Sequence, residues 1–245
     1  MIGIIGGSGL EKPEFLKQSE KKEFKTPFGK TSAPITVGKI GKTEVAVLSR
    51  HGYRHEYTPS KVPYLANLWA LKELGITHIL AASACGSLRE EIRPGDFVVP
   101  SQVIDFSKHR PHSFNHEKGI NCHTPFGEPF SKKLNRLLEE SLAEKKFRFH
   151  SDKTVVTIEG PRFSSRAESN MFRNWECDII NMTTATEATL AKELEIEYSV
   201  LATATDYDSW KTDCTPVTYK EVLEIMKQNA GKAIDVFLQT IPKIG

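Results

Sequence analysis

Three segments of the sequence place hydrogen-bond donors where they could hold an anion such as phosphate. The glycine-rich turn GGSGL at residues 6–10 exposes backbone N–H groups, and Ser8 adds a hydroxyl donor. Arg50 offers a forked guanidinium, and His51 beside it could donate to the same anion. Thr183 stands where a helix is expected to begin, and the positive end of a helix favours an anion. Each segment also has a simpler interpretation: a tight turn, a basic surface loop and a helix cap.

Known nucleotide and metal motifs do not fit these segments. The glycine turn lacks the third glycine of a dinucleotide-binding fingerprint, because Lys12 takes its place, and the Walker A pattern is also absent. His51 and His55 are four residues apart, as metal ligands on a helix can be. Gly52 and Pro59 disfavour a helix there, and no HExxH motif is present. We therefore expect no metal site.

A second group of residues could bind and protonate a flat ring. Phe163 is available to stack on such a ring, although it could equally be a core aromatic. Asp206 and Asp208 follow a predicted strand and could pair with ring donors or transfer a proton, or they could belong to a turn. Cys85 could be proposed as a nucleophile, but no base is tied to it by sequence, which favours a small packed thiol.

The elements that must position these residues alternate between apolar runs and helical patterns. Three predicted helices begin with a capping box, at Ser165 to Glu168, Thr184 to Glu187 and Thr218 to Glu221. Near-continuous apolar strands mixed with amphipathic helices indicate an α/β fold with a mostly buried sheet, in which chemistry gathers at strand ends. The predicted strands are 2–5, 44–49, 78–82, 97–99, 154–158, 178–180 and 198–202, and the predicted helices are 63–74, 131–146, 166–175, 185–195 and 219–240.

Composition narrows the class of protein. The chain of 245 residues shows no linker or composition shift, so we expect one domain over residues 1–245. A net charge of +2 gives no electrostatic reason to expect nucleic acid or an anionic membrane as partner. The N-terminus lacks the pattern of a signal peptide, and the four cysteines are scattered without a zinc spacing. These features predict a cytoplasmic protein with reduced thiols.

Long literal stretches of the chain resemble the S-methyl-5′-thioadenosine phosphorylases, within the trimeric purine nucleoside phosphorylase superfamily. The resembling stretches are IGIIGGSGL, SRHGYRH, ACGSLREEIRPGDFVVP, TIEGPRFSSRAES, INMTT and ATDYDSW, which together run from the N-terminus past residue 210. The resemblance implies an α/β phosphorylase fold around a distorted central mixed sheet flanked by helices. It further implies a homotrimer, a nucleoside and inorganic phosphate as substrates, no metal or organic cofactor, and a reaction of purine and methionine salvage.

The resemblance also assigns roles to individual residues. The catalytic residues would be Asp206 and Asp208. Phosphate would be held by Ser8, Arg50, His51, Ser83, the amide of Ala84, and Thr183. The nucleoside would contact Phe163, Ser164, Asn181, Met182, Thr205, Asp206 and Asp208. The 5′ substituent would lie near His55, Ser164, Tyr219 and Val222, and His123 would reach in from the neighbouring subunit.

A few positions depart from the family pattern. Ser8 and Ser83 stand where the family often has Thr, Ala185-Thr186 replaces Val-Pro, and Tyr219 is bulkier than the Val of some relatives.

Alternatives to cleavage of methylthioadenosine are phosphorolysis of 6-oxopurine nucleosides or methylthioinosine, a nucleosidase that uses water, and a nucleotide-binding module without turnover. The anion donors argue against the nucleosidase, because water needs no such cradle.

Overall fold

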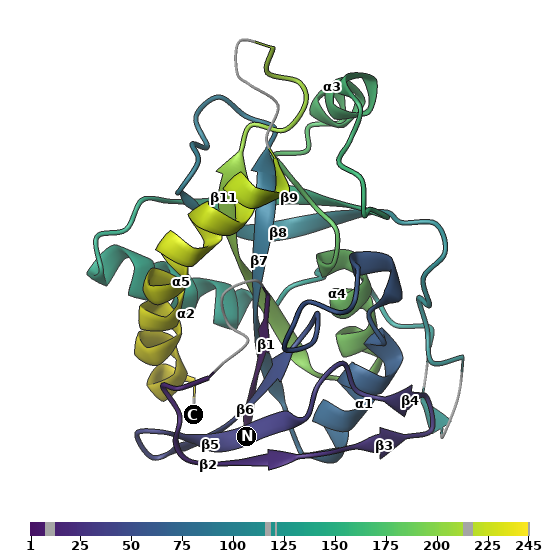
Figure 1. Cartoon of the computed structure of the whole chain (residues 1–245), viewed down its shortest axis with the longest axis vertical. Helices are drawn as coiled ribbons and strands as arrows, with labels where there is room; N and C mark the ends of the chain where they lie inside the picture. Colours follow the sequence, from purple (N-terminus) through teal and green to yellow (C-terminus); the bar gives the residue numbers. More distant parts are fainter. Residues whose placement is uncertain (8–12, 116–118, 121, 213–217, 245) are drawn as a thin grey trace.

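The protein is built around one large mixed β-sheet with helices on both faces (Figure 1). The computed structural model describes residues 1–7, 13–115, 119–120, 122–212 and 218–244, apart from the side chains of residues 219, 220 and 223. The strands are β1 (Ile2–Gly6), β2 (Lys17–Lys22), β3 (Lys25–Thr26), β4 (Gly29–Lys30), β5 (Ile35–Ile40), β6 (Thr43–Ser49), β7 (His78–Ser87), β8 (Phe97–Phe106), β9 (Phe149–Ile158), β10 (Ile179–Asn181) and β11 (Glu197–Asp206).

The order of strands in the sheet is β10-β9-β8-β11-β7-β1-β6-β5-β2, and β10 pairs a second time, with β7. This second pairing is antiparallel and sets Ile180 opposite Gly86, so β7, β11, β8, β9 and β10 form a closed ring of paired strands. Strands β6, β1, β7 and β11 are mutually parallel, and their carboxyl ends therefore share one edge. The pairing of β10 with β7 brings the end of β10 to that same edge. The ends of β1, β6, β7, β10 and β11, which are distant in sequence, therefore lie together there.

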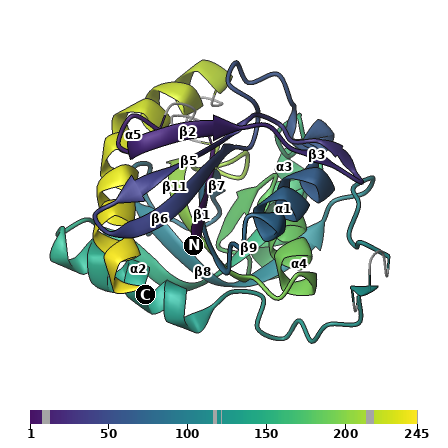
Figure 2. The ribbon, with the colours of Figure 1, turned by 90° about the horizontal axis from the view of Figure 1, so that it is seen from below.

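Helices cover both faces of the sheet (Figures 1 and 2). Helices α1 and α4 pack together on one face, and α2 and α5 pack together on the other. The helices are α1 (Tyr64–Glu73), α2 (Lys132–Glu144), α3 (Arg166–Asn174), α4 (Thr184–Glu193) and α5 (Tyr219–Thr240), with short 3-10 helices at Pro59–Lys61 and Ile241–Lys243. Among the helices described, none combines the length and apolar character needed to cross a bilayer.

Each central strand contributes to two hydrophobic cores. Along β6, Ala46 and Leu48 join the core under α1 and α4, whereas Val45 and Val47 join the core under α2 and α5. Successive side chains of a strand point to opposite faces, so a strand buried on both faces must be apolar at every position. The apolar runs at 44–49 and 78–82 are therefore strands, as predicted, and the expected mixed sheet flanked by helices is confirmed.

The structure adds strands that the sequence pattern did not indicate. Strand β2 has the sequence KQSEKK and is exposed along its whole length, so it carries no apolar signal. It exists because its backbone pairs with β5 at the edge of the sheet. Strands β7, β8, β9 and β11 also extend to ten residues each, beyond their apolar runs, and the added residues of β7 and β11 carry the site.

Candidate active site

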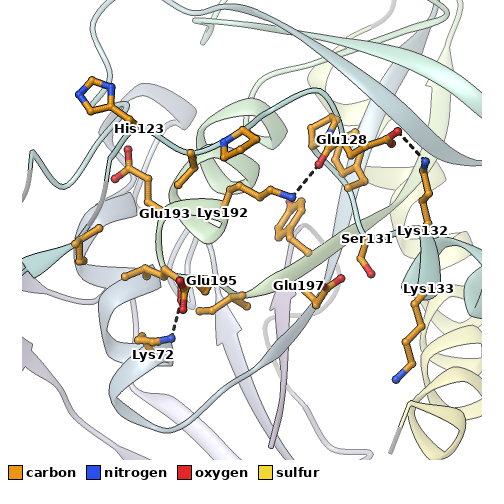
Figure 3. Close-up of a pocket in the computed structure, with 18 of the residues that line it drawn as sticks. Lys72, His123, Glu128, Ser131, Lys132, Lys133, Lys192, Glu193, Glu195 and Glu197 are labelled. Carbon is orange, nitrogen blue, oxygen red and sulfur yellow. Dashed lines mark hydrogen bonds and ion pairs between the residues drawn. The ribbon is translucent and has the colours of Figure 1, made fainter.

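Of two cavities on the described part of the chain that we compare, the larger one, of about 1010 Å³, is not where the predicted site residues gather. It lies around the loop from α4 to β11, at the end of β11 opposite Asp206 (Figure 3). Lys132 pairs with Glu128 at 2.7 Å, and Lys192 donates to the carbonyl oxygen of Glu128 at 3.1 Å. Both of these ammonium groups therefore contact Glu128.

The smaller cavity, of about 470 Å³, lies at the edge where the strands end. It is large enough for a nucleoside and an anion, and its lining residues come from the ends of six strands, β1, β6, β7, β9, β10 and β11. Fourteen of the residues predicted for the site line it: Arg50, His51, His55, Ser83, Ala84, Phe163, Ser164, Asn181, Met182, Thr183, Thr205, Asp206, Asp208 and Val222. Ser8 lies outside the described residues, as does the side chain of Tyr219, and His123 lines the larger cavity instead.

Arg50 follows β6 directly and is 1% exposed. Its Nε and Nη2 both donate to the carboxylate of Glu187, the latter at 2.9 Å, and its Nη1 donates to the carbonyl oxygen of Ala82 at 2.8 Å. Burial alone would lower the pKa of Arg50, but the charge and hydrogen bonds of Glu187 outweigh burial and raise it. These bonds use three of the five guanidinium N–H groups, which leaves at most two for an anion.

Glu187 was expected to close a capping box with Thr184, and this prediction was wrong. The N-cap of α4 is Thr183, which makes no side-chain capping hydrogen bond, and Thr184 is the first helical residue. Glu187 is 1% exposed and points into the core, where it binds Arg50, 137 residues away, and accepts from the hydroxyl of Tyr198 at 2.8 Å. The other two capping boxes, at Ser165 and Thr218, are confirmed.

The remaining groups at the anion end of the cavity come from β7, β10 and α4. Ser83 is buried, and its hydroxyl donates to the carbonyl of Ala84 at 3.0 Å. Asn181 donates to Ser83 at 3.2 Å and to the hydroxyl of Thr184 at 2.6 Å, so its amide braces the strand end against the start of α4. Thr183 is also buried and faces the cavity at the positive end of α4.

The opposite end of the cavity holds the carboxyl pair. Asp206 accepts from the hydroxyl of Thr205 at 2.7 Å and from the backbone N–H of Asp208 at 3.0 Å. Burial raises the pKa of Asp206 to about 6, and the neighbouring charge of Asp208 adds to the rise. Burial also raises the pKa of Asp208, whose carboxylate accepts from the hydroxyl of Ser164 at 2.5 Å. The pKa of Asp206 therefore lies closer to neutral pH than the pKa of an exposed aspartate.

Glycine and cysteine on β7 line the cavity beside this pair. A Cβ on Gly86 would come within 3.0 Å of Ile180 and 3.2 Å of Asp208, so only glycine lets β10 and the carboxyl pair approach β7 this closely. Cys85 is 3% exposed, and burial, followed by the charge of Asp206, raises the pKa of its thiol well above the usual range. Cys85 is therefore the packed thiol that we expected.

Two further segments line the cavity, the loop after β9 and the end of β10. Phe163 is 40% exposed and lines the cavity, in keeping with a ring that stacks on a ligand rather than one packed in the core. Gly160 has a φ of +65°, and a Cβ there would come within 2.5 Å of the Met182 sulfur. The loop after β9 thus comes close to Met182 because residue 160 is glycine.

Arg110 is a residue of the site's framework that the sequence analysis missed. It is 5% exposed, and its guanidinium donates to the carbonyl oxygens of Met182 and Glu159, and to that of Ile158 at 3.2 Å. Arg110 therefore ties the ends of β9 and β10 together. Neither Arg110 nor Glu187 stood out in the sequence, because Arg110 sits in a polar stretch and Glu187 fitted a helix-capping pattern.

Within the described stretches, no three His, Cys, Asp or Glu side chains gather in a way that could hold a metal ion. What the cavity offers is an end rich in hydrogen-bond donors and an end with a protonatable carboxyl. This arrangement suits transfer of a sugar between a base and an anion.

Comparison with known proteins decides the family. The model of the phosphorylase superfamily matches residues 1–242. The chain belongs to this superfamily. It is 47% identical over 247 residues to S-methyl-5′-thioadenosine phosphorylase of Danio rerio, covering 99% of this chain and 88% of that protein.

Solved structures of superfamily members share the fold closely. The methylthioadenosine phosphorylase of Schistosoma mansoni in complex with adenine matches with a TM-score of 0.95 and 37% identity, covering 100% of this chain and 91% of that one. A single-residue variant of the adenosine/methylthioadenosine phosphorylase from the same organism, in complex with methylthioadenosine, matches with a TM-score of 0.94 at the same identity and coverage. The superfamily fold therefore extends over the whole chain.

Proposed function

We propose that this protein uses inorganic phosphate to cleave S-methyl-5′-thioadenosine, giving adenine and 5-methylthioribose 1-phosphate. The observation that carries the proposal is one cavity with anion donors around Arg50 at one end and the raised-pKa carboxyl of Asp206 at the other. Relatives covering nearly the whole chain are named for this substrate, and a solved relative holds it.

The donors around Arg50 bind phosphate, and Asp206 protonates the departing base. The bond between C1′ of the sugar and N9 of adenine breaks, which leaves a sugar with oxocarbenium character. A phosphate oxygen, held by Arg50, Ser83, Thr183 and the Ala84 amide, forms the new bond to C1′. The departing base takes a proton at N7 from Asp206, which solvent then reprotonates. Positioned proton transfer of this kind contributes about 10²–10⁴-fold to the rate.

Phosphate dependence is the decisive test of the proposal. Adenine release from methylthioadenosine should require phosphate, and Arg50→Ala should lower kcat/KM for phosphate by about ten- to a hundredfold, because hydrogen bonds to charged groups contribute about 1.5–3 kcal/mol. Equal release of adenine in phosphate-free buffer would overturn the proposal in favour of a nucleosidase. Binding of nucleoside without any turnover would favour the binding module.

The carboxyl pair supports selectivity for 6-aminopurines. Protonated Asp206 can donate to N7 while its other oxygen accepts from the 6-amino group of adenine. A 6-oxopurine presents an acceptor at that position, which an ionised carboxylate repels. A mismatched buried polar group costs about 1–3 kcal/mol, so the preference should lie between about fivefold and about 160-fold. A preference of the wild-type enzyme for methylthioinosine would make this a 6-oxopurine phosphorylase.

We also propose that the protein is a homotrimer and that it is located in the cytoplasm. His123 does not line the proposed active-site cavity of its own chain, and the family resemblance assigns it to the site of a neighbouring subunit. Analytical ultracentrifugation should therefore give a trimer, and His123→Ala should raise the KM for the nucleoside. A fully active monomer at micromolar concentration would contradict this part.

A further inference from the structure

The ring of His51 is held in one orientation by the loop that follows β6. Its Nδ1 lies 2.8 Å from the backbone carbonyl oxygen of Tyr57, and the Tyr57 N–H donates back to the carbonyl of His51 at 3.1 Å. The ring also stacks on His55, with 4.5 Å between ring centroids and an interplanar angle of 17°. A carbonyl oxygen only accepts hydrogen bonds, so Nδ1 of His51 must carry a hydrogen.

The surroundings of His51 keep its ring neutral. Burial, followed by the positive charge of Arg50, lowers the pKa of His51 to about 3, and Arg110 and His55 act in the same direction. Only the hydrogen bond to Tyr57 opposes them. A neutral imidazole has one N–H, and here it is on Nδ1. Nε2, on the other edge of the ring, therefore presents a lone pair.

The ring of His51 shares its cavity with several hydrogen-bond donors. The ring lines the same cavity as Arg50, Ser83 and Thr183, whose guanidinium and hydroxyl groups can donate to an anion. Phosphate at neutral pH carries at least one P–OH, in either of its two ionisation states. Sulfate has the same tetrahedral shape and nearly the same size, but it carries no hydrogen. An acceptor in the anion site can therefore tell the two anions apart.

We propose that Nε2 of His51 accepts a hydrogen bond from the P–OH group of phosphate and thereby selects phosphate over sulfate. This inference rests on the proposed function, which places phosphate in this cavity. No proton needs to be transferred, because the hydrogen stays on the phosphate. In the phosphate dianion, fixing the protonated oxygen at His51 also leaves three unprotonated oxygens for Arg50, the hydroxyl donors and C1′ of the sugar. His51 is thus a specificity residue that acts as an acceptor, whereas the sequence had suggested a donor.

Competition between the two anions tests the inference. The dissociation constants of inorganic phosphate and of sulfate are measured by calorimetry for the whole protein, together with the inhibition constant of sulfate against phosphate. Wild type should bind phosphate about ten- to a hundredfold more tightly than sulfate, the range that hydrogen bonds to charged groups support. His51→Ala should weaken phosphate but not sulfate, so the ratio of the two constants should fall about tenfold or more.

Thr183→Val is the matched control, because it removes a donor from the same site and keeps the shape of the side chain. Both anions should weaken together in this variant, and their ratio should stay within about threefold of wild type. An unchanged ratio in His51→Ala, with adenine release still dependent on phosphate, would refute the role of His51 and leave the proposed function standing. Phosphate-independent release in the wild type would instead refute the proposed function.

A measurement on the wild-type protein keeps the inference testable if His51→Ala does not fold. Long-range proton–nitrogen NMR spectra of protein labelled with ¹⁵N-histidine report which ring nitrogen carries the hydrogen. We expect His51 to be protonated on Nδ1 and unprotonated on Nε2, without phosphate and at pH 7. A His51 with hydrogen on Nε2, or with hydrogens on both nitrogens, would refute the inference.

Discussion

In the proposed mechanism Asp206 gives a proton to the departing adenine, so the pKa of Asp206 should set the pH dependence of the reaction. Burial, with a smaller contribution from the charge of Asp208, raises this pKa to about 6. About one molecule in ten then holds the proton at pH 7, and about one in a hundred at pH 8. At saturating phosphate, kcat/KM for methylthioadenosine should fall above pH 6, and the slope should approach tenfold per pH unit.

Asp206→Asn removes the proton donor and keeps a side chain of the same shape. The amide of this variant cannot titrate, so kcat/KM should drop by about 10²–10⁴-fold at pH 6 and lose the descending limb. The amide N–H₂ can donate to O6 of a 6-oxopurine, which should shift the preference toward methylthioinosine. Asp208→Asn is the control, because it removes the like charge beside Asp206 and should move the limb to lower pH without abolishing it.

The assay is spectrophotometric purine release between pH 5.5 and 9 with both nucleosides. A wild-type profile that stays flat across this range would refute the assignment of Asp206 as the proton donor. Retention of the descending limb in Asp206→Asn would refute it equally, because the limb would then belong to another group.

Three further outcomes are expected. Glu187→Ala should lower the free energy of unfolding by about 3–5 kcal/mol, measured by urea unfolding, because it leaves the Arg50 charge buried without a partner. The same variant should raise the phosphate KM more than it lowers kcat, measured by phosphate titration. An unchanged KM would show that Glu187 does not position Arg50. Because the pKa of Asp206 is raised from 3.8 to about 6 by folding, the free energy of unfolding should fall as the pH rises through this range. The Asp206→Asn variant should therefore be more stable than wild type by about 1–3 kcal/mol above pH 6, and by little at pH 4. Calorimetry that finds the same stability difference at both pH values would contradict this. Methylthioadenosine should react faster than AMP, because the only basic side chains that we assign to the 5′ end are two histidines, His55 beside Val222 and His123 from the neighbouring subunit, and no Lys or Arg. A faster reaction with AMP would reverse that prediction.

The amino-acid sequence determined the class of the fold and the general location of the chemistry. Apolar runs such as residues 44–49 and 78–82 indicated strands buried on both faces, because a strand with only one buried face alternates polar and apolar side chains, and both runs are strands. Polar and small residues at the ends of these runs indicated where a ligand would approach. Local hydrogen-bond patterns were also legible, as the capping boxes at Ser165 and Thr218 show.

Only the tertiary structure decided which partner each charged group has and what its protonation state is. Glu187 fitted a local capping pattern, yet it lies against Arg50 from 137 positions away. The raised pKa of Asp206 and the lowered pKa of His51 both come first from burial, and the hydrogen on Nδ1 of His51 is set by the Tyr57 carbonyl. Local patterns depend on neighbouring backbone groups, whereas desolvation and charge interactions depend on every atom brought near by the fold. The pairing of β10 with β7, which closes the sheet and assembles the site, is likewise a contact between segments that no local pattern links.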